Sequence, residues 1–187
     1  MRAMYEIRWN GRAGQGIITV SRLLGYAAIL EGKYAQAFPQ FGPERIGAPI
    51  VGYTRISDEP IEIHSAVYKP DAVVVLDDTV PRIVKVTDGL KRNGKLLINS
   101  IRNPRELKKE LDVKDAKCYS VDATQISLDI LGNSRAINTA MLGALVKSES
   151  LVSIDALNRV LKKRFGKTIA EKNIAVLLQA YKEVIEV

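Results

Sequence analysis

The chain has 187 residues, 47% of them hydrophobic, which is enough to bury a substantial core within one domain spanning residues 1–187. Its apolar stretches are shorter than the roughly 20 residues of a membrane-spanning helix, and the first residues lack the apolar region of a secretory signal. We therefore expect a cytoplasmic protein without membrane partners. Lysine and arginine outnumber aspartate and glutamate by 28 to 21, a net charge of +7. Apart from short runs at 107–110 and 161–167, the basic residues are scattered, and they are not interleaved with aromatic residues, so we expect no nucleic acid partner.

Cysteine and histidine are scarce: Cys118 and His64 are the only ones. An iron–sulfur cluster generally needs several thiolates, and a structural zinc ion needs several Cys or His ligands. The chain therefore supplies no metal site of these kinds, and the electron carriers of any redox system would lie on another chain. We interpret Cys118 as a small core residue and expect His64 to be exposed.

The first part of the chain predicts a strand, a helix and a second strand. Residues 4–10 alternate apolar and polar side chains, as strands do. The helix begins at Ile17, and Gly32 provides its C-terminal stop. A second strand is predicted over residues 33–38, and residues 39–49, with three prolines and two glycines, predict a loop.

The middle of the chain continues the alternation that is typical of an α/β domain. Residues 50–56 and 61–65 alternate around a turn and predict an antiparallel hairpin. Residues 71–76, "DAVVVL", are continuously apolar, as expected of a central strand buried on both faces. A helix is predicted over residues 80–94. The next predicted elements are a strand over 95–100, a helix over 104–111 and a strand over 116–121.

From about Asp122 onward the pattern is helical. Ser153 is the predicted N-cap of one amphipathic helix. Thr168 and Glu171 match a capping box at the start of the last helix. The apolar face predicted for that helix consists of Ile174, Leu177, Leu178 and Tyr181. The fold class predicted from the whole chain is α/β with three layers: a Rossmann-like, mostly parallel sheet, an antiparallel hairpin and C-terminal helices.

The junction between the first strand and the first helix is "GRAGQG", residues 11–16. A dinucleotide-binding turn has glycines at its first, third and sixth positions and a carboxylate at the end of the second strand. Here Ala13 takes the third position and the second strand ends in Phe38, so NAD is disfavoured. Glu31 lies at a suitable distance along the chain but at the end of the helix. The Gly-Lys-Ser/Thr sequence of a phosphate-loop ATPase does not follow the turn.

Two interpretations of the turn remain open. Unpaired amides at the start of the helix favour an anion there, and Arg12 adds a positive charge. Alternatively, Gly14 and Gly16 only permit a tight turn and close packing of the helix on the sheet.

Four motifs together resemble one family, over nearly the whole chain. They are "GRAGQG", "QAFPQFGPERIGAP", "PDAVVVLD" and "INTAMLGALVKS". The combination is similar to the gamma subunits of the 2-oxoacid:ferredoxin oxidoreductases, which include pyruvate:ferredoxin oxidoreductase (pyruvate synthase). "ERIGAP" looks more like the pyruvate and 2-oxoisovalerate subunits than the indolepyruvate and 2-oxoglutarate ones. The chain departs from the family pattern at Ala13, which replaces a glycine, and at Ile46, where a second arginine is common.

The resemblance implies a multi-chain enzyme of class EC 1.2.7.-, with pyruvate synthase (1.2.7.1) as the expected member. It converts a 2-oxoacid, coenzyme A and oxidised ferredoxin to acyl-CoA, carbon dioxide and reduced ferredoxin. The implied partners are alpha, beta and ferredoxin-like delta subunits, which carry thiamine diphosphate, Mg and the [4Fe-4S] clusters. We expect this chain to carry no catalytic residue and to serve assembly and coenzyme A binding.

The predicted binding or subunit-interface site is formed where the glycine turn meets the loop from Phe38 to Pro49, at the carboxyl ends of the parallel strands. Arg12 and Arg45 would face phosphates of coenzyme A or carboxylates of partner subunits, and Glu44 would orient Arg45. The alternative is a solvated Glu44–Arg45 pair of little energetic value. The predicted site residues are Gly11, Arg12, Gly14, Gln15, Gly16, Glu44 and Arg45.

Two questions stay open. Asp77, after the buried strand, has either a structural role, such as capping the next helix, or a catalytic one. The alternative function for the chain is a free-standing nucleotide-binding module, or the same subunit of a 2-oxoisovalerate or indolepyruvate oxidoreductase.

Overall fold

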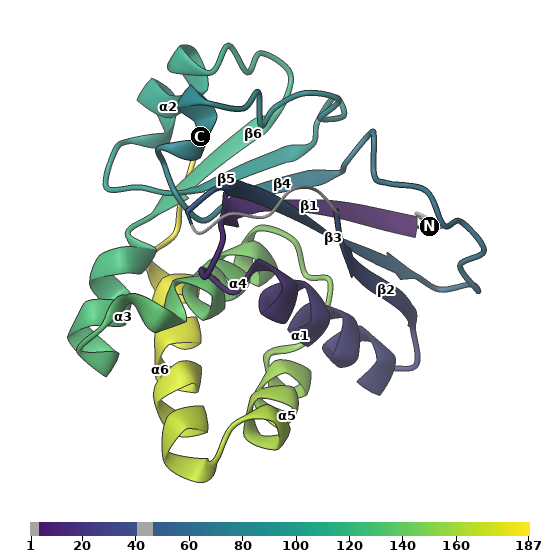
Figure 1. Cartoon of the computed structure of the whole chain (residues 1–187), viewed down its shortest axis with the longest axis vertical. Helices are drawn as coiled ribbons and strands as arrows, with labels where there is room; N and C mark the ends of the chain where they lie inside the picture. The colour runs from purple at the N-terminus through teal and green to yellow at the C-terminus, as the bar shows by residue number, and fades with distance from the viewer. Residues whose placement is uncertain (1–3, 41–46) are drawn as a thin grey trace.

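The computed structural model describes residues 4–40 and 47–187 (Figure 1). Their strands form one seven-stranded sheet in the order β2-β3-β1-β4-β5-β6-β7. The strands are β1 (Met4–Arg12), β2 (Tyr34–Pro39), β3 (Pro49–Ser57), β4 (Ala72–Val75), β5 (Lys95–Asn99), β6 (Lys117–Val121) and β7 (Ile185–Glu186). The helices are α1 (Ile17–Leu30), α2 (Pro104–Glu110), α3 (Ala123–Leu131), α4 (Ile137–Ser148), α5 (Ile154–Arg164) and α6 (Lys167–Glu183). Two 3-10 turns are η1 (Val80–Arg82) and η2 (Ser134–Ala136).

The centre of the sheet is parallel and its edges are antiparallel. β1, β4, β5 and β6 run in one direction. β3 runs against both β1 and β2, and β7 runs against β6. This arrangement confirms the predicted α/β class with a parallel core, antiparallel strands and C-terminal helices.

One face of the sheet is covered by helices. The odd-numbered side chains of β1, which are Tyr5, Ile7 and Trp9, are buried in the core cluster that these helices share. Figure 1 shows α1 and α4 directly beneath the strands, with α5 and α6 further from them. α4 and α6 approach closely at Gly143, where an added Cβ would lie 2.1 Å from the carbonyl oxygen of Leu177. The apolar periodicity of the C-terminal half therefore forms a continuous core, as predicted.

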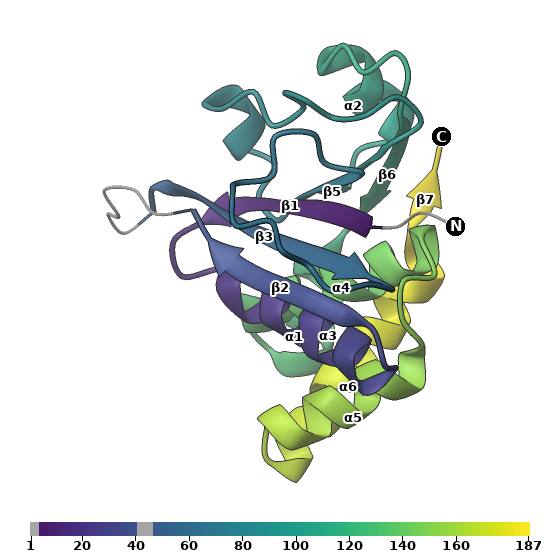
Figure 2. The same cartoon turned by 90° about the vertical axis from the view of Figure 1, so that its right-hand side faces the viewer.

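The opposite face is covered by α2 and by two irregular segments, residues 58–71 and 76–94 (Figure 2). β4 is buried on both sides, because Val73 and Val75 pack in this second core while Ala72 and Val74 pack in the first. Cys118 belongs to the second core and is fully buried, so its predicted core position is confirmed.

The predicted hairpin of residues 50–56 and 61–65 is wrong, because the second of these segments forms no strand. β3 pairs instead with β1 and β2. The buried guanidinium of Arg55 donates hydrogen bonds to the carbonyls of Ile63 (3.3 Å), Ser65 (2.8 Å) and Ala66 (3.3 Å). These carbonyls are therefore bound by a side chain rather than by a neighbouring strand.

The predicted helix over residues 80–94 is also wrong, since only the 3-10 turn η1 forms there. The segment is rich in β-branched residues, which lowers its helix propensity. Gly89 has φ +72°, and a Cβ added there would lie 2.0 Å from the carbonyl oxygen of Tyr68. Arg8 donates to the carbonyls of Val86 (2.8 Å) and Asp88 (2.5 Å). In a helix these carbonyls would accept hydrogen bonds from backbone amides instead.

Two of the three predicted helix ends are confirmed by the structure. Gly32, with φ +80°, follows the end of α1 as predicted. The Ser153 hydroxyl accepts a hydrogen bond from the amide of Ala156 (3.1 Å), which confirms the predicted N-cap. The capping box of Thr168 and Glu171 is wrong, because the N-cap of α6 is Gly166, two residues before Thr168, and the helix has no side-chain cap.

Candidate functional site

The glycine turn leads from β1 into α1 through two left-handed residues. Gly14 has φ +93° and Gly16 has φ +75°. The positive φ of Gly16 favours glycine there, and an added Cβ would lie 2.4 Å from Nδ2 of Asn138 in α4, so that side chain would have to move. Gly16 is the N-cap of α1 and provides no side chain to cap the first amides. The start of α1 therefore presents backbone N–H groups.

Gln15 folds back against the turn and connects it to the neighbouring strand. Its Oε1 accepts a hydrogen bond from the amide of Arg12 (2.7 Å), and its Nε2 donates to Oδ2 of Asp77 (3.0 Å). An added Cβ at Gly11 would lie 2.9 Å from the same Oε1. The first glycine of the motif thus makes room for the Gln15 side chain.

Arg12 faces residues of its own chain. Its Nη2 and Nε donate to the hydroxyl of Thr79 (2.6 and 3.2 Å), and its Nη1 donates to the carbonyl of Gly47 (2.8 Å). Nε also lies 3.3 Å from Oδ2 of Asp77. The guanidinium therefore links the glycine turn to two other segments.

The turn meets the end of the Phe38–Pro49 loop. The amide of Ala13 donates to the carbonyl of Ala48 (3.0 Å), and Arg12 pairs with Pro49 at the end of the β1–β3 ladder. The structure thus brings five predicted site residues together beside Gly47–Pro49. The other two, Glu44 and Arg45, lie outside the described residues, as does the family departure Ile46.

Asp77 is the acceptor at the centre of this network. One oxygen accepts from the amide (3.0 Å) and the hydroxyl (2.5 Å) of Thr79, while the other accepts from Gln15. Burial by itself raises the pKa of Asp77, but the hydrogen bonds from Thr79 and Gln15 and the charge of Arg12 outweigh it, and the pKa is lowered overall. The bond to the Thr79 amide is an Asx turn before η1, so Asp77 does not cap a regular helix.

A groove of about 470 Å³ runs along the carboxyl ends of β4, β5 and β6. Its lining residues are polar or acidic for the most part: Gln15, Leu76, Asp77, Asp78, Thr79, Asn99, Ser100, Ile101, Asp122, Thr124, Gln125 and Ile137. Among the described residues that line it there are three carboxylates and no basic side chain. A phosphate is therefore disfavoured in this groove.

Three residues near the turn were not predicted as site residues. Thr79 bridges Arg12 and Asp77, and only the three-dimensional contact reveals it. Asn138 donates to the carbonyl of Gly16 (3.3 Å), and its place in "INTAMLGALVKS" was the available signal. Asn10 is 3% exposed, and its Nδ2 has no hydrogen-bond partner among residues 4–40 and 47–187.

The described residues contain no group of three or more His, Cys, Asp or Glu that could hold a metal ion. Burial raises the pKa of Cys118 to about 11, so this thiol is not an activated nucleophile at neutral pH. His64 is exposed, as predicted. In the part of the chain that the structure describes, no helix is long and apolar enough to cross a membrane.

These observations define a class: a Rossmann-like α/β protein whose glycine turn is held by side chains of the same chain. A family model described as pyruvate ferredoxin/flavodoxin oxidoreductase matches residues 6–183. The common gamma subunit of the pyruvate/ketoisovalerate oxidoreductases of Thermococcus litoralis is 43% identical over 182 residues, which cover 97% of this chain and 98% of that protein.

Solved structures agree. The crystal structure of pyruvate oxidoreductase subunit PORC (EC 1.2.7.1) from Thermotoga maritima has a TM-score of 0.88 and 38% identity, covering 99% of each chain. The 2-oxoglutarate:ferredoxin oxidoreductase from Magnetococcus marinus, with 2-oxoglutarate, coenzyme A and succinyl-CoA bound, has a TM-score of 0.76 and 19% identity. That match covers 97% of this chain and 31% of the other, and it shows a shared fold.

The chain belongs to the gamma subunits of the pyruvate and 2-oxoacid ferredoxin oxidoreductases, and is thus a subunit of an enzyme of the pyruvate synthase class (EC 1.2.7.1). The resemblance predicted from the four motifs is confirmed.

Proposed function

We propose that this gamma subunit serves the assembly of the oxidoreductase and forms one wall of its coenzyme A site. Its partners in the cytoplasm are alpha, beta and delta subunits, which carry thiamine diphosphate, Mg and the [4Fe-4S] clusters and pass electrons to ferredoxin. The expected 2-oxoacid is pyruvate, with 2-oxoisovalerate as the alternative. The Thermococcus litoralis relative is a common subunit of pyruvate and ketoisovalerate oxidoreductases, which supports substrate selection by the other chains.

The observation that carries the proposal is the uncapped start of α1 beside Gly47–Pro49. Helix N-termini attract anions because their first amides are unpaired and the helix dipole is positive there. No atom of residues 4–40 and 47–187 would lie within 4 Å of a Cβ added at Gly14, which lets a ligand approach the backbone closely. The Magnetococcus marinus enzyme, whose chain contains this fold, has coenzyme A bound, which supports the same class of ligand here.

Two substitutions test the coenzyme A site in the reconstituted complex. Gly14→Val places a branched side chain at a left-handed residue in open space, and Arg12→Ala removes the cation. We expect both to raise the KM for coenzyme A in acyl-CoA formation. Gly132→Val is the matched control, because Gly132 also has a positive φ (+73°) and open space but ends α3.

Unchanged coenzyme A dependence in both variants would exclude this part of the proposal. Assembly is tested separately, by co-purification and by the mass of the complex in solution. A stable isolated monomer that binds NAD or ATP with micromolar affinity would instead support a free-standing nucleotide-binding module.

A further inference from the structure

Two adjacent carbonyls at the end of the Phe38–Pro49 loop are held by adjacent residues of the turn. The carbonyl of Gly47 accepts from the Arg12 side chain (2.8 Å), and the carbonyl of Ala48 accepts from the Ala13 amide (3.0 Å). Gly47 is itself left-handed, with φ +78°. The side-chain bond from Arg12 therefore fixes the peptide plane at which the chain enters β3.

The guanidinium of Arg12 can reach Gly47 only in a defined orientation. The Thr79 hydroxyl accepts hydrogen bonds from two of its nitrogens and donates one to Oδ1 of Asp77, while Oδ2 of Asp77 lies 3.3 Å from Nε. A planar guanidinium bound along one edge presents its remaining edge in a fixed direction. Asp77 and Thr79 thus determine where Nη1 points.

The ion pair between Arg12 and Asp77 also indicates that Arg12 acts within its own chain. The Arg12 side chain is 27% exposed and the Asp77 side chain 18%, and the two groups form an ion pair. The positive charge of Arg12 is therefore balanced within the chain before any ligand arrives. An anion at the turn would therefore be held chiefly by the backbone amides at the start of α1, beside the peptides that Arg12 fixes.

We propose that Asp77 and Thr79 are positioning residues that act through Arg12, and that the three form a latch fixing the Gly47–Ala48 peptides against the glycine turn. The latch orders this part of the site before coenzyme A binds. Its consequence for coenzyme A affinity rests on the proposed function, whereas its effect on the Gly47–Ala48 peptides does not.

Lysine at position 12 separates a latch from a direct phosphate contact. Arg12→Lys keeps the charge but loses the planar group that spans Thr79 and Gly47. If Arg12 binds a phosphate as a point charge, Arg12→Lys retains most of the coenzyme A affinity and Arg12→Ala does not. The latch predicts that both raise the KM for coenzyme A about tenfold, the ratio expected for one lost charge-assisted hydrogen bond, with kcat changed less.

Asp77→Asn and Thr79→Val test the other two members. Asp77→Asn keeps the shape but removes the charge opposite Arg12, and Thr79→Val removes the bridging hydroxyl. In the reconstituted complex we expect the KM for coenzyme A to rise about tenfold in Asp77→Asn and about threefold in Thr79→Val, at nearly constant kcat. Asp115→Asn is the control, since Asp115 forms an exposed ion pair with Arg92 away from the turn.

A second readout needs no coenzyme A. In the full-length gamma chain, hydrogen exchange followed by NMR reports the Ala13 amide, which is bonded to Ala48. We expect this amide to exchange about tenfold faster in Asp77→Asn than in the wild type, by loss of one charge-assisted hydrogen bond. The Asp115→Asn control should exchange like the wild type.

The two readouts separate the hypotheses. Faster exchange with a raised KM supports both the latch and the coenzyme A site. Faster exchange with an unchanged KM supports the latch and contradicts the proposed coenzyme A site. Unchanged exchange at Ala13 in both Asp77→Asn and Thr79→Val overturns the latch, whatever happens to the KM.

Discussion

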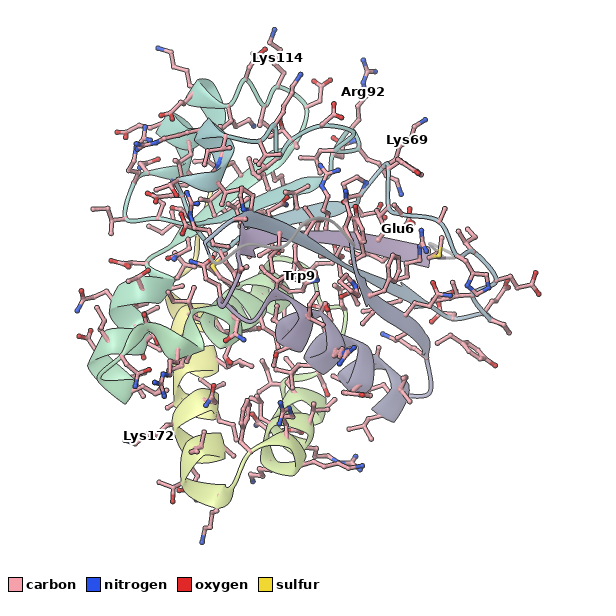
Figure 3. All side chains as sticks on the ribbon, viewed as in Figure 1. Glu6, Trp9, Lys69, Arg92, Lys114 and Lys172 are labelled. Carbon is pink, nitrogen blue, oxygen red and sulfur yellow. The ribbon has the colours of Figure 1, made fainter. Side chains whose placement is uncertain are left out.

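The two faces of the sheet are covered in different ways, and β1 shows both. Its odd-numbered side chains, such as Trp9, are buried under helices, as Figure 3 shows for Trp9 beside α1. Of its even-numbered side chains, Arg8 and Arg12 donate to carbonyls of irregular segments on the other face. Glu6 pairs there with Arg55 of β3 and with Lys91. Apolar packing holds the first cover, which needs only the right periodicity. The second cover has an apolar core of its own, and arginine-to-carbonyl hydrogen bonds add to it. These hydrogen bonds depend on residues far apart in the sequence.

The largest effect is expected on the helical face. Trp9→Ala should lower the free energy of unfolding by about 4 kcal/mol, because it leaves a cavity beneath α1 and removes the hydrogen bond from Nε1 to the hydroxyl of Thr54 on β3 (2.9 Å). Urea denaturation of the isolated chain measures it. Trp9→Phe, which refills much of the space, should lose less than half as much.

On the other face, Arg55→Met should lower the free energy of unfolding by about 3 kcal/mol. Arg55 is 1% exposed and pairs with Glu6 (2.9 Å), so its removal leaves a carboxylate without its nearest cation and the carbonyls of residues 63, 65 and 66 without their donor. Hydrogen exchange should increase most over residues 58–67. Arg92→Met, which breaks an exposed ion pair, should change stability by less than about 0.5 kcal/mol.

If Arg55→Met lowers the free energy of unfolding no more than Arg92→Met does, the buried arginine does not stabilise the irregular cover. The proposed difference between the two faces of the sheet would then be wrong. A loss greater than that in Trp9→Ala would reverse the ranking of the two faces.

The same contrast explains what could be predicted from the sequence. The elements with a clear period, such as α1, β4 and the C-terminal helices, form as predicted because their buried faces follow from local spacing. The segments 61–65 and 80–94 carry strand-like and helix-like patterns as well. Their carbonyls are bound by Arg55 and Arg8, and neither contact can be deduced from a window of neighbouring residues.

Some residues of the candidate site could also be predicted from local sequence, and others could not. Residues 11–16 could be located from the glycine spacing and its place between a strand and a helix. The roles of Asp77 and Thr79 could not, because each acts through the orientation of the Arg12 side chain in space. Asn138 lies between these cases: the motif singled it out, but its bond to Gly16 comes from the packing of α4 against α1.

A smaller effect is expected within the helical layer. Ser153→Ala should lower the free energy of unfolding by about 1 kcal/mol, because it leaves the Ala156 amide without its cap. Thr168→Ala, at the position of the wrongly predicted capping box, should change it by less than about 0.5 kcal/mol. Equal losses in thermal or urea denaturation would show that Thr168 caps α6 in solution.

The smallest effect concerns pH and the Arg12–Asp77 pair on the polar face of β1. The folded-state pKa of Asp77 is lowered from its ordinary 3.8, so the ionised carboxylate stabilises the fold above that pH, and this contribution is lost as the pH falls through the lower, folded-state pKa. In Asp77→Asn the group cannot titrate. The stability difference between wild type and Asp77→Asn in urea should therefore be constant from about pH 5 to pH 7 and shrink below pH 3.8. A difference that grows on acidification would mean that protonated Asp77 is the form that the folded chain prefers, and the latch would then lack its charge.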